Sequence, residues 1–337
     1  MSIRRNALSL LALATLPAGA TVAQDMHAGH RMAAGPRCLG LPESKVAVQT
    51  YNFAGPLTGT TIPVEWDALP MPAKFQKAMP TFANVFGPRA SQPTREQIAT
   101  VLKNIRDLGY RNVEGFDLIS QSSPETYAEL LKANGLQAIG NHTELDPAQW
   151  PARLAEAKTR GQAFVGSSGF GKPGFDTLEH TLETARNLNE LGRAAQAQGL
   201  KLYVHNHDKE LSTQFLYDRG DGKSVMTSAW EIVAANTDPR LVHFEVDVFW
   251  ALAAFKPEHF NDLIAFLERN HSRIAMLHIK DLSAEGAMVA PGKGMIDWRK
   301  VVTAAGPQVA YYIIEYDLPS DAAKVSKEGY KYLTCKA

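Results

Sequence analysis

Four apolar runs in the second half of the sequence end in side chains of the types that hold divalent metals. They are Leu202–His207, Val242–Asp247, Ile274–Lys280 and Tyr311–Glu315. The candidate ligands are a histidine of the first run, Asp247, His278 and Glu315. Carboxylates and imidazoles without a thiolate suit Mn²⁺, Co²⁺, Fe²⁺ or Zn²⁺. We therefore predict that the four ends meet around one divalent metal ion.

Alternation along each run places the candidates opposite apolar residues. Side chains of an extended strand point in turn to its two faces. Asp247 therefore shares a face with Glu245, whereas Val246 lies on the other face. Ionised groups need partners when they are buried, and a cation would supply one. The alternative is an internal network of ion pairs without metal, in which Lys280 binds Asp247 or Glu315.

These runs belong to a longer alternation of strand-like and helix-like segments that begins near residue 45. Four earlier strands are predicted at Val46–Tyr51, Arg111–Phe116, Leu136–His142 and Gln162–Gly166. Amphipathic helices are predicted at 94–108, 124–134, 147–160, 178–198, 225–236, 257–270, 297–305 and 320–333. Glycines directly after four of these patterns match left-handed helix caps; they are Gly109, Gly135, Gly161 and Gly199.

Eight strand–helix pairs predict one (β/α)₈ TIM barrel over residues 45–334, a fold whose functional residues gather at the carboxyl ends of the strands. A doubly wound sheet is the alternative, but no glycine-rich phosphate loop follows the first strand. Segment 53–93 is too long for an ordinary connection and contains many proline and aromatic residues. We interpret it as an extended loop inserted over the mouth of the barrel.

The first residues have the pattern of an export signal. Arg4 and Arg5 precede an apolar stretch at 7–20 that is too short to span a bilayer, and Thr21–Ala23 offers a cleavage site. We expect residues 1–23 to be a signal peptide, with either an imperfect twin-arginine pattern or general secretion as the route. Residues 24–44 would then be a flexible linker, and the mature protein would be periplasmic.

The two cysteines, Cys38 and Cys335, flank the predicted barrel. An exported protein meets an oxidising compartment, and the ends of a barrel lie close together because its last strand pairs with its first. We predict a Cys38–Cys335 disulfide, with two free thiols as the alternative.

Composition limits the classes of function. The 337 residues carry no formal net charge and are 45% hydrophobic, so the core can be large. The charge balance argues against a broad nucleic-acid surface and against a polybasic membrane patch. No later segment is long and apolar enough to predict a membrane span in the mature form. A homo-oligomer is left open.

Five motifs resemble those of the xylose-isomerase-like TIM barrels, a superfamily of sugar phosphate isomerases and epimerases. They are His205–Glu210 (HNHDKE), Phe244–Trp250 (FEVDVFW), Leu277–Asp281 (LHIKD), Gly292–Trp298 (GKGMIDW) and Ile314–Asp317 (IEYD). The resemblance extends from about Val46 to Leu333. It also covers Glu114 on the second predicted strand and His142 on the third.

The resemblance implies one metal ion held from strands five to eight. Asp247, His278 and Glu315 carry over directly, but the first family glutamate is absent. Aligning the strand ends places His205 there, with His207 or Glu210 as alternatives. Epimerases of the family use two metal-bound glutamates as opposed bases, so a histidine disfavours simple C3 epimerisation. It favours isomerisation, or elimination from a keto sugar.

The shared chemistry of the family would be removal of a proton next to a carbonyl, through an enediolate. The base would be Glu315 or His207, and Lys280 would stabilise the oxyanion or donate a proton. The substrate-binding candidates are Glu114, His142 and Trp250. The first two could instead orient the metal ligands, and the tryptophan could serve packing alone.

Two classes of function follow. The first is a metal-dependent sugar isomerase, epimerase or lyase that acts on a free sugar, a keto sugar or a cyclitol. A phosphorylated substrate is disfavoured because no phosphate loop or arginine cluster is present and because sugar phosphates are mainly cytoplasmic. The second is a non-catalytic periplasmic carbohydrate-binding barrel. Metal content combined with a substrate screen distinguishes the two.

Overall fold

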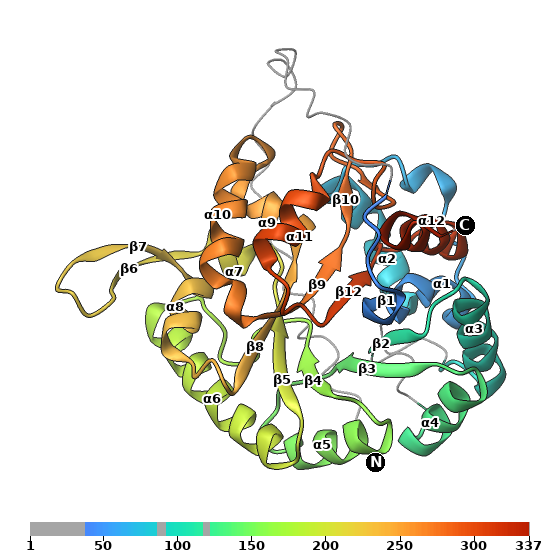
Figure 1. Cartoon of the computed structure of the whole chain (residues 1–337), viewed down its shortest axis with the longest axis horizontal. Coiled ribbons are helices and arrows are strands. Elements are labelled where there is room, and N and C mark those ends of the chain that lie inside the picture. Colours follow the sequence, from blue (N-terminus) through green and yellow to red (C-terminus); the bar gives the residue numbers. More distant parts are fainter. Residues whose placement is uncertain (1–37, 86–91, 117–121, 337) are drawn as a thin grey trace.

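Eight parallel strands close into a barrel at the centre of the molecule (Figure 1). This computed structural model describes residues 38–85, 92–116 and 122–336. In barrel order the strands are β1 (Val46–Gln49), β12 (Tyr311–Ile314), β9 (Ile274–Ile279), β8 (Val242–Asp247), β5 (Lys201–His205), β4 (Phe164–Ser167), β3 (Gln137–His142) and β2 (Asn112–Phe116). Strand β1 pairs with both β2 and β12, which closes the barrel. The predicted TIM barrel and its eight predicted strands are confirmed.

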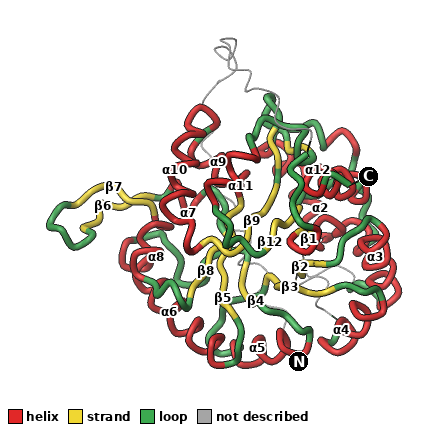
Figure 2. The backbone as a smooth tube through the Cα atoms, viewed as in Figure 1, coloured by secondary structure: helices red, strands yellow, loops and turns green. Residues whose placement is uncertain are grey.

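Helices connect the strands and form the outer ring (Figure 2). The main ones are α3 (Arg95–Asp107), α4 (Pro124–Ala133), α5 (Trp150–Thr159), α6 (Leu178–Ala197), α8 (Ala229–Asn236), α10 (Phe260–Asn270), α11 (Trp298–Ala305) and α12 (Ala322–Thr334). Local sequence sets their starts: Thr94 caps α3 in a reciprocal capping box with Gln97. Two short helices, α7 (Lys209–Ser212) and α9 (Val248–Phe255), follow the ends of β5 and β8.

An apolar layer lies beneath the ends of the strands. Two of its buried members, Tyr203 and Met276, precede His205 and His278 by two residues and so share their faces. The complete set is Ala47, Ile139, Phe164, Tyr203, Met276 and Ile313. Polar residues of these strands are therefore concentrated toward the carboxyl ends.

The long connection between β1 and α3 lies against those ends. It contains α1 (Ala54–Thr58) and α2 (Met71–Val85). The Phe75 ring of α2 lies 5.7 Å from the Trp250 ring, and the Lys74 ammonium lies 4.6 Å from the centre of the Tyr316 ring. Pro70 forms an isolated bridge with Ala287. The inserted segment is therefore partly helical and packs beside the candidate site.

One predicted helix boundary is wrong. The helix expected from residue 225 begins at Ala229, with Ser228 as its cap. Residues Ser224–Ser228 form β7, which pairs antiparallel with β6 (Gln214–Asp218) in a hairpin that leaves the ring of helices (Figure 1). A second small sheet joins β10 (Asp281–Leu282) to β11 (Met288–Val289). Neither sheet belongs to the barrel.

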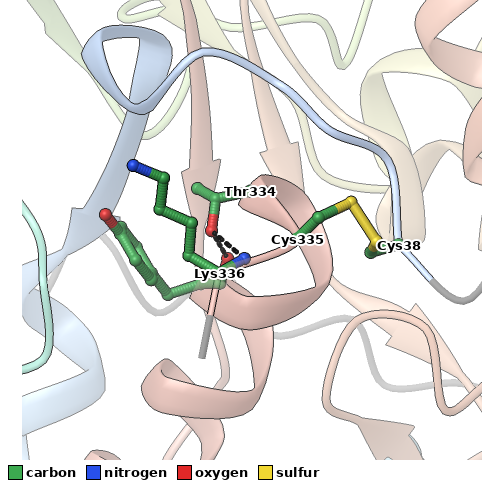
Figure 3. Close-up of a disulfide and its surroundings, with 5 residues drawn as sticks. Cys38, Thr334, Cys335 and Lys336 are labelled. Atoms are coloured by element: carbon green, nitrogen blue, oxygen red, sulfur yellow. Dashed lines mark hydrogen bonds between the residues drawn. A yellow bond between two sulfur atoms is a disulfide. The ribbon is translucent and has the colours of Figure 1, made fainter.

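The predicted disulfide between Cys38 and Cys335 is confirmed (Figure 3). Next to it the Leu39 N–H donates to the Tyr332 carbonyl over 2.8 Å, and the Leu41 N–H donates to the Leu333 carbonyl over 2.7 Å. These contacts fasten the segment before β1 to the end of α12. The predicted signal peptide and residues 24–37 of the predicted linker lie outside the described residues. Within the described part of the chain, no helix has the length and apolar character that crossing a membrane requires.

Candidate metal centre

The carboxyl ends of β5, β8, β9 and β12 bring the four predicted ligands together. His205, Asp247 and His278 lie on the first three strands, and Glu315 follows β12 directly. All four are buried, and one donor atom from each lies within 4.8 Å of the others. The barrel order makes these strands neighbours, so side chains at their ends converge.

Of the three candidates near strand five, His205 belongs to this group. His207 lies beside it, with ring centres 5.2 Å apart. Glu210 turns back instead, and its Oε2 accepts a hydrogen bond of 2.8 Å from the His207 backbone N–H. The geometry therefore favours His205 among the three as the ligand from this strand.

Strand register aligns the site. Asp247 lies opposite His278 in the β8–β9 pair, and His205 lies opposite Glu245 in the β5–β8 pair. The β8–β9 register shifts between Phe244 and Glu245. Irregularities of this kind redirect side chains and are common beside active sites. Here the shift places His278, instead of Leu277, opposite Asp247.

Lys280 connects the carboxylates at the mouth of the barrel. Its Nζ lies 3.0 Å from Asp247 Oδ2, 2.6 Å from Glu315 Oε2 and 2.9 Å from Asp317 Oδ1. These carboxylates raise the pKa of the lysine well above its usual value, against the opposing effect of burial. The contacts of Lys280 with Asp247 and Glu315 that the metal-free alternative requires are therefore present. We call Asp247, Glu315 and Lys280 the outer layer.

Glu245 is a buried carboxylate in contact with three imidazoles, and the sequence analysis does not predict it as a site residue. Its Oε2 lies 2.9 Å from His142 Nε2, 3.0 Å from His205 Nδ1 and 3.2 Å from His278 Nε2. The available signal was its position two residues before Asp247, on the same face of β8. The three imidazoles lower the pKa of Glu245 well below its usual value, although burial alone would raise it.

Glu114 completes this deeper group. It accepts hydrogen bonds from Gln49 Nε2 over 2.8 Å, from the Tyr203 hydroxyl over 2.5 Å and from His278 Nε2 over 2.7 Å. Tyr203 fits because Gly166 lacks a side chain: a Cβ there would lie 2.5 Å from the tyrosine ring. We call Glu114, His142 and Glu245 the inner layer. The sequence-predicted Glu114 and His142 are thus both at the site.

The rings of His205 and His278 link the two layers. His205 Nδ1 faces Glu245, and its Nε2 lies 3.7 Å from Asp247 Oδ2. His278 Nε2 faces Glu114, and its Nδ1 lies 2.7 Å from Glu315 Oε2. A carboxylate that accepts from one ring nitrogen fixes which nitrogen carries the proton. The inner layer therefore leaves His205 Nε2 and His278 Nδ1 to face the outer layer.

Burial and neighbouring charges set the protonation of these groups. Burial raises the pKa of Asp247 to about 6, in spite of Lys280 and His278. Burial, followed by the charge of His278, lowers the pKa of His205 well below its usual value. Against burial, Glu245, Glu315 and Glu114 raise the pKa of His278 well above its usual value. His205 is thus a neutral donor of a lone pair.

The outer donors fit a divalent cation. They comprise two imidazole nitrogens and two carboxylates, a mixed set that suits metals of intermediate hardness. Asp247 Oδ2 is buried without a well-formed hydrogen bond to any described residue, although Lys280 Nζ lies 3.0 Å away. Glu245 Oε1 is also buried without a hydrogen-bond donor in the described part of the chain. A cation would compensate such buried oxygens.

Aromatic side chains border the site. The half-buried Trp250 ring lies 5.7 Å from the His207 ring and 5.7 Å from the Phe75 ring. Lys280 Nζ lies 6.0 Å from the centre of the same indole. The indole N–H of Trp250 is buried and has no acceptor among the described residues. Phe75, which sequence did not single out, joins Trp250 in a wall beside the outer layer.

Comparisons with known proteins agree with the barrel fold. A family model described as xylose isomerase-like TIM barrel matches residues 102–334. Inosose dehydratase from Salmonella typhimurium is 27% identical over 162 residues, which cover 42% of this chain and 48% of that protein. The chain thus matches about half the length of this curated relative.

Solved structures share the architecture at low identity. A sugar phosphate isomerase/epimerase from Parabacteroides distasonis has a TM-score of 0.60 at 18% identity, covering 86% of this chain and 97% of that chain. A xylose isomerase-like TIM barrel protein from Mycobacterium smegmatis, in complex with magnesium, has a TM-score of 0.52 at 18% identity, covering 74% and 91%. At these identities the likeness confirms the fold.

Proposed function

The chain belongs to the xylose isomerase-like TIM-barrel family, and from this premise we propose that it is a divalent-metal-dependent enzyme that removes a proton next to the carbonyl of a keto sugar or keto cyclitol. The supporting observation is the convergence of His205, Asp247, His278 and Glu315, whose donor atoms lie within 4.8 Å of one another. Isomerisation, epimerisation and elimination can all begin with this proton removal.

The metal would be held by these four side chains. A bound divalent cation supplies Lewis-acid stabilisation of the negative charge that develops on a carbonyl oxygen. The inner layer contributes by holding both imidazoles in the required tautomer, because carboxylates that accept from ligand histidines fix ring orientation and raise ligand basicity.

Two different groups are placed to move the substrate proton. Burial, followed by the charge of Lys280, lowers the pKa of His207 to about 3, so its imidazole is neutral at physiological pH and is a weak base. Glu315 is held ionised because Lys280 and His278 lower its pKa well below the usual value, against burial. The strands β8 and β9 separate the elements that carry these two residues.

The pairing of an imidazole with a carboxylate favours an elimination or an isomerisation over symmetric epimerisation. In an elimination His207 or Glu315 would take the proton next to the carbonyl, and the ammonium of Lys280, which lies 2.6 Å from Glu315 Oε2, would give a proton to the leaving hydroxyl. Inosose dehydratase, by its name, removes water from a keto cyclitol, and its partial match supports the lyase branch.

Trp250 and Phe75 would form the apolar side of the substrate site. An aromatic wall can cover one face of a sugar ring, and the unpaired indole N–H could donate to a substrate hydroxyl. The placement of α2 beside this wall also supports a role for the inserted segment in excluding water.

The test combines metal analysis with isotope exchange. Purified protein is analysed for bound Mn, Co, Fe, Zn and Mg, then incubated in D₂O with a set of keto sugars and inososes. We expect stoichiometric metal, and deuterium incorporation or loss of one water from at least one compound. A protein that binds these compounds but contains no metal and exchanges no proton would instead be the non-catalytic binding barrel.

We also propose that the protein is exported to the periplasm. The disulfide between Cys38 and Cys335 supports this, since such bonds persist mainly in oxidising compartments. Cell fractionation of the full-length chain, with mass spectrometry of the mature N-terminus, tests the proposal. Recovery of an uncleaved protein from the cytoplasm would contradict it.

A further inference from the structure

The barrel centre contains a second group of donor atoms, deeper than the one that would hold the proposed metal. One donor atom from each of its four buried residues lies within 4.8 Å of the others. We call this group the inner set: His142, His205, Glu245 and His278. The outer set is the group of the proposed metal: His205, Asp247, His278 and Glu315. The two sets share the rings of His205 and His278.

The inner donors are spaced as a small tetrahedral ion requires. Zinc–nitrogen bonds of about 2.0–2.1 Å at tetrahedral angles place neighbouring donors roughly 3.3 Å apart. The central donor of the inner set is Glu245. Its Oε2 lies 2.9 Å from His142 Nε2, 3.0 Å from His205 Nδ1 and 3.2 Å from His278 Nε2. Its Oε1 is buried without a hydrogen-bond donor in the described part of the chain, and a cation would compensate this oxygen.

The shared rings cannot serve both sets at once. A neutral imidazole carries a proton on one nitrogen and a lone pair on the other. His205 directs Nδ1 toward Glu245 and Nε2 toward Asp247, over 3.0 and 3.7 Å. His278 directs Nε2 toward Glu245 and Nδ1 toward Glu315, over 3.2 and 2.7 Å. A metal in one set therefore requires each shared ring to carry its proton on the nitrogen that faces the other set.

Carboxylates on both sides are placed to face these protons. With a metal in the outer set, the inward N–H groups of the shared rings face Glu245. With a metal in the inner set, the outward N–H groups face Asp247 and Glu315, which keep the Lys280 ammonium at 3.0 and 2.6 Å. The two arrangements thus differ only in the position of the ion and of the ring protons.

The donor types indicate which ion suits each set. Imidazole suits Zn²⁺, whereas carboxylate suits Mn²⁺ and Mg²⁺. The inner set has three imidazoles and one carboxylate, and the outer set has two of each. We propose that the inner set is a second metal position, for Zn²⁺ or another cation that prefers imidazole, and that it and the outer set exclude one another. This inference concerns metal binding and does not rest on the proposed reaction.

Metal uptake by chelator-stripped protein tests the inner set. The full mature chain is titrated with Zn²⁺ and with Mn²⁺ by calorimetry, and we expect one equivalent of either metal for the unmodified protein. Because Glu245 Oε2 already contacts three imidazoles, an inner ion replaces existing contacts and is held less tightly than an outer one. Asp247→Asn should therefore be isolated without metal and bind no Mn²⁺, yet take up one equivalent of added Zn²⁺.

A second substitution assigns that Zn²⁺ to the inner set. Adding His142→Gln to Asp247→Asn should abolish the uptake of Zn²⁺. The matched control adds His259→Gln, which changes an exposed histidine on the surface, and it should leave the uptake unchanged. Circular dichroism checks that each variant is folded. Zn²⁺ uptake that does not depend on His142 would overturn the proposal.

The position of the ion can also be measured without the His142 substitution. Anomalous diffraction at the zinc edge from Asp247→Asn crystals should give a peak among the inner set. A peak beside Glu315, or no uptake of Zn²⁺ by Asp247→Asn, would overturn the proposal. Two equivalents of metal in the unmodified protein would overturn the exclusion between the sets. An unmodified protein that binds no Mn²⁺ would instead contradict the outer set and the proposed function, while Asp247→Asn would still decide the inner set.

Discussion

The inner and outer layers of the barrel centre are built from the same residue types but differ in how their charges are compensated. In the inner layer, Glu114 accepts three hydrogen bonds and Glu245 lies within 3.2 Å of three imidazoles. In the outer layer, Asp247 and Glu315 share the ammonium of Lys280, and Glu315 Oε2 also lies 2.7 Å from His278 Nδ1. The inner carboxylates are therefore the better compensated, although Glu245 Oε1 has no donor among the described residues, and His142, His205, Glu245 and His278 also offer donor atoms within 4.8 Å of one another.

The balance of buried charges also indicates that the outer layer needs a cation. Five buried carboxylates are close together, and Lys280 is the ammonium that contacts three of them; they are Glu114, Glu245, Asp247, Glu315 and Asp317. A buried charge is costly unless it is paired. Without a metal, protons on His278 and on carboxyl groups must supply the missing positive charge. A divalent cation in the outer layer would take over that role, and each prediction below removes one side of this balance.

Substitution of Asp247 should have the largest effect. Lewis-acid stabilisation contributes several kcal/mol, and each ~1.4 kcal/mol is tenfold in rate, so we expect about a 10³-fold or greater loss of turnover together with loss of bound metal. Asp247 also caps α9 through the Trp250 N–H. Asp247→Asn keeps that cap, whereas Asp247→Ala removes it, so both should lose metal and only the second should lose stability. Full metal occupancy in both variants would contradict the ligand assignment.

Substitution of His207 should separate chemistry from metal binding. His207→Gln removes the neutral imidazole beside the outer layer while leaving the four ligands in place. We expect turnover to fall by about 10²–10⁴-fold, the range of a lost general base, with unchanged metal content. Elemental analysis and steady-state kinetics on the same preparation check this. A parallel loss of metal would show that His207 is a ligand and would move it into the outer layer.

The effect of a Glu245 substitution on metal affinity tests whether the inner layer orients the metal ligands. An amide in Glu245→Gln cannot accept from three imidazoles, so the tautomer of His205 would no longer be fixed. Loss of such an orienting carboxylate typically lowers metal affinity about 10–100-fold. Competition with a chelator measures it, and cobalt absorption spectra report the altered ligand field. Glu129→Gln, at an exposed glutamate on α4, is the control. An unchanged affinity would mean that the inner layer serves packing only.

The sequence indicates site residues where a position that faces inward by alternation also lies at the end of a strand. Asp247, His278 and Glu315 each close an apolar run, so their convergence followed from the barrel alone. Glu245 was overlooked because it lies inside its run, and its role depends on three imidazoles that arrive from other strands. Contacts of that kind depend on strand register, including the shift before Glu245, which a single sequence does not encode visibly.

The hairpin was missed for a different physical reason. Val225 and Met226 precede a true helix, so their apolar character extended the helical pattern by four residues. Apolar patterns in a sequence arise mainly from residues that are buried in the core. The strands of the exposed hairpin are not buried there, so they lack a clear strand pattern. Ser228 was the available signal, because a serine followed three residues later by Glu231 is typical of a helix start.

Glu210 extends the comparison to a buried carboxyl that forms no ion pair with a cation or an imidazole among the described residues, and it should give the smallest effect. Burial raises its pKa to about 7, from a usual value near 4.5. Between these pH values the folded protein holds a proton that the unfolded chain has released. The free energy of unfolding contributed by this group therefore falls as pH rises from about 4.5 to about 7.

Glu210→Gln should remove that dependence while its carbonyl still accepts from the His207 N–H. One unit of pKa shift corresponds to ~1.4 kcal/mol, and the short helix α7 can move to admit water, so we expect the variant to be more stable by about 1–2 kcal/mol above pH 7. At pH 4 the two proteins should be equal, since the carboxyl is protonated in both states. Urea unfolding of the metal-loaded proteins at both pH values measures the difference. If the difference in unfolding free energy between the two proteins is the same at both pH values, Glu210 is already ionised in the folded state. Its buried charge would then be compensated without the metal centre.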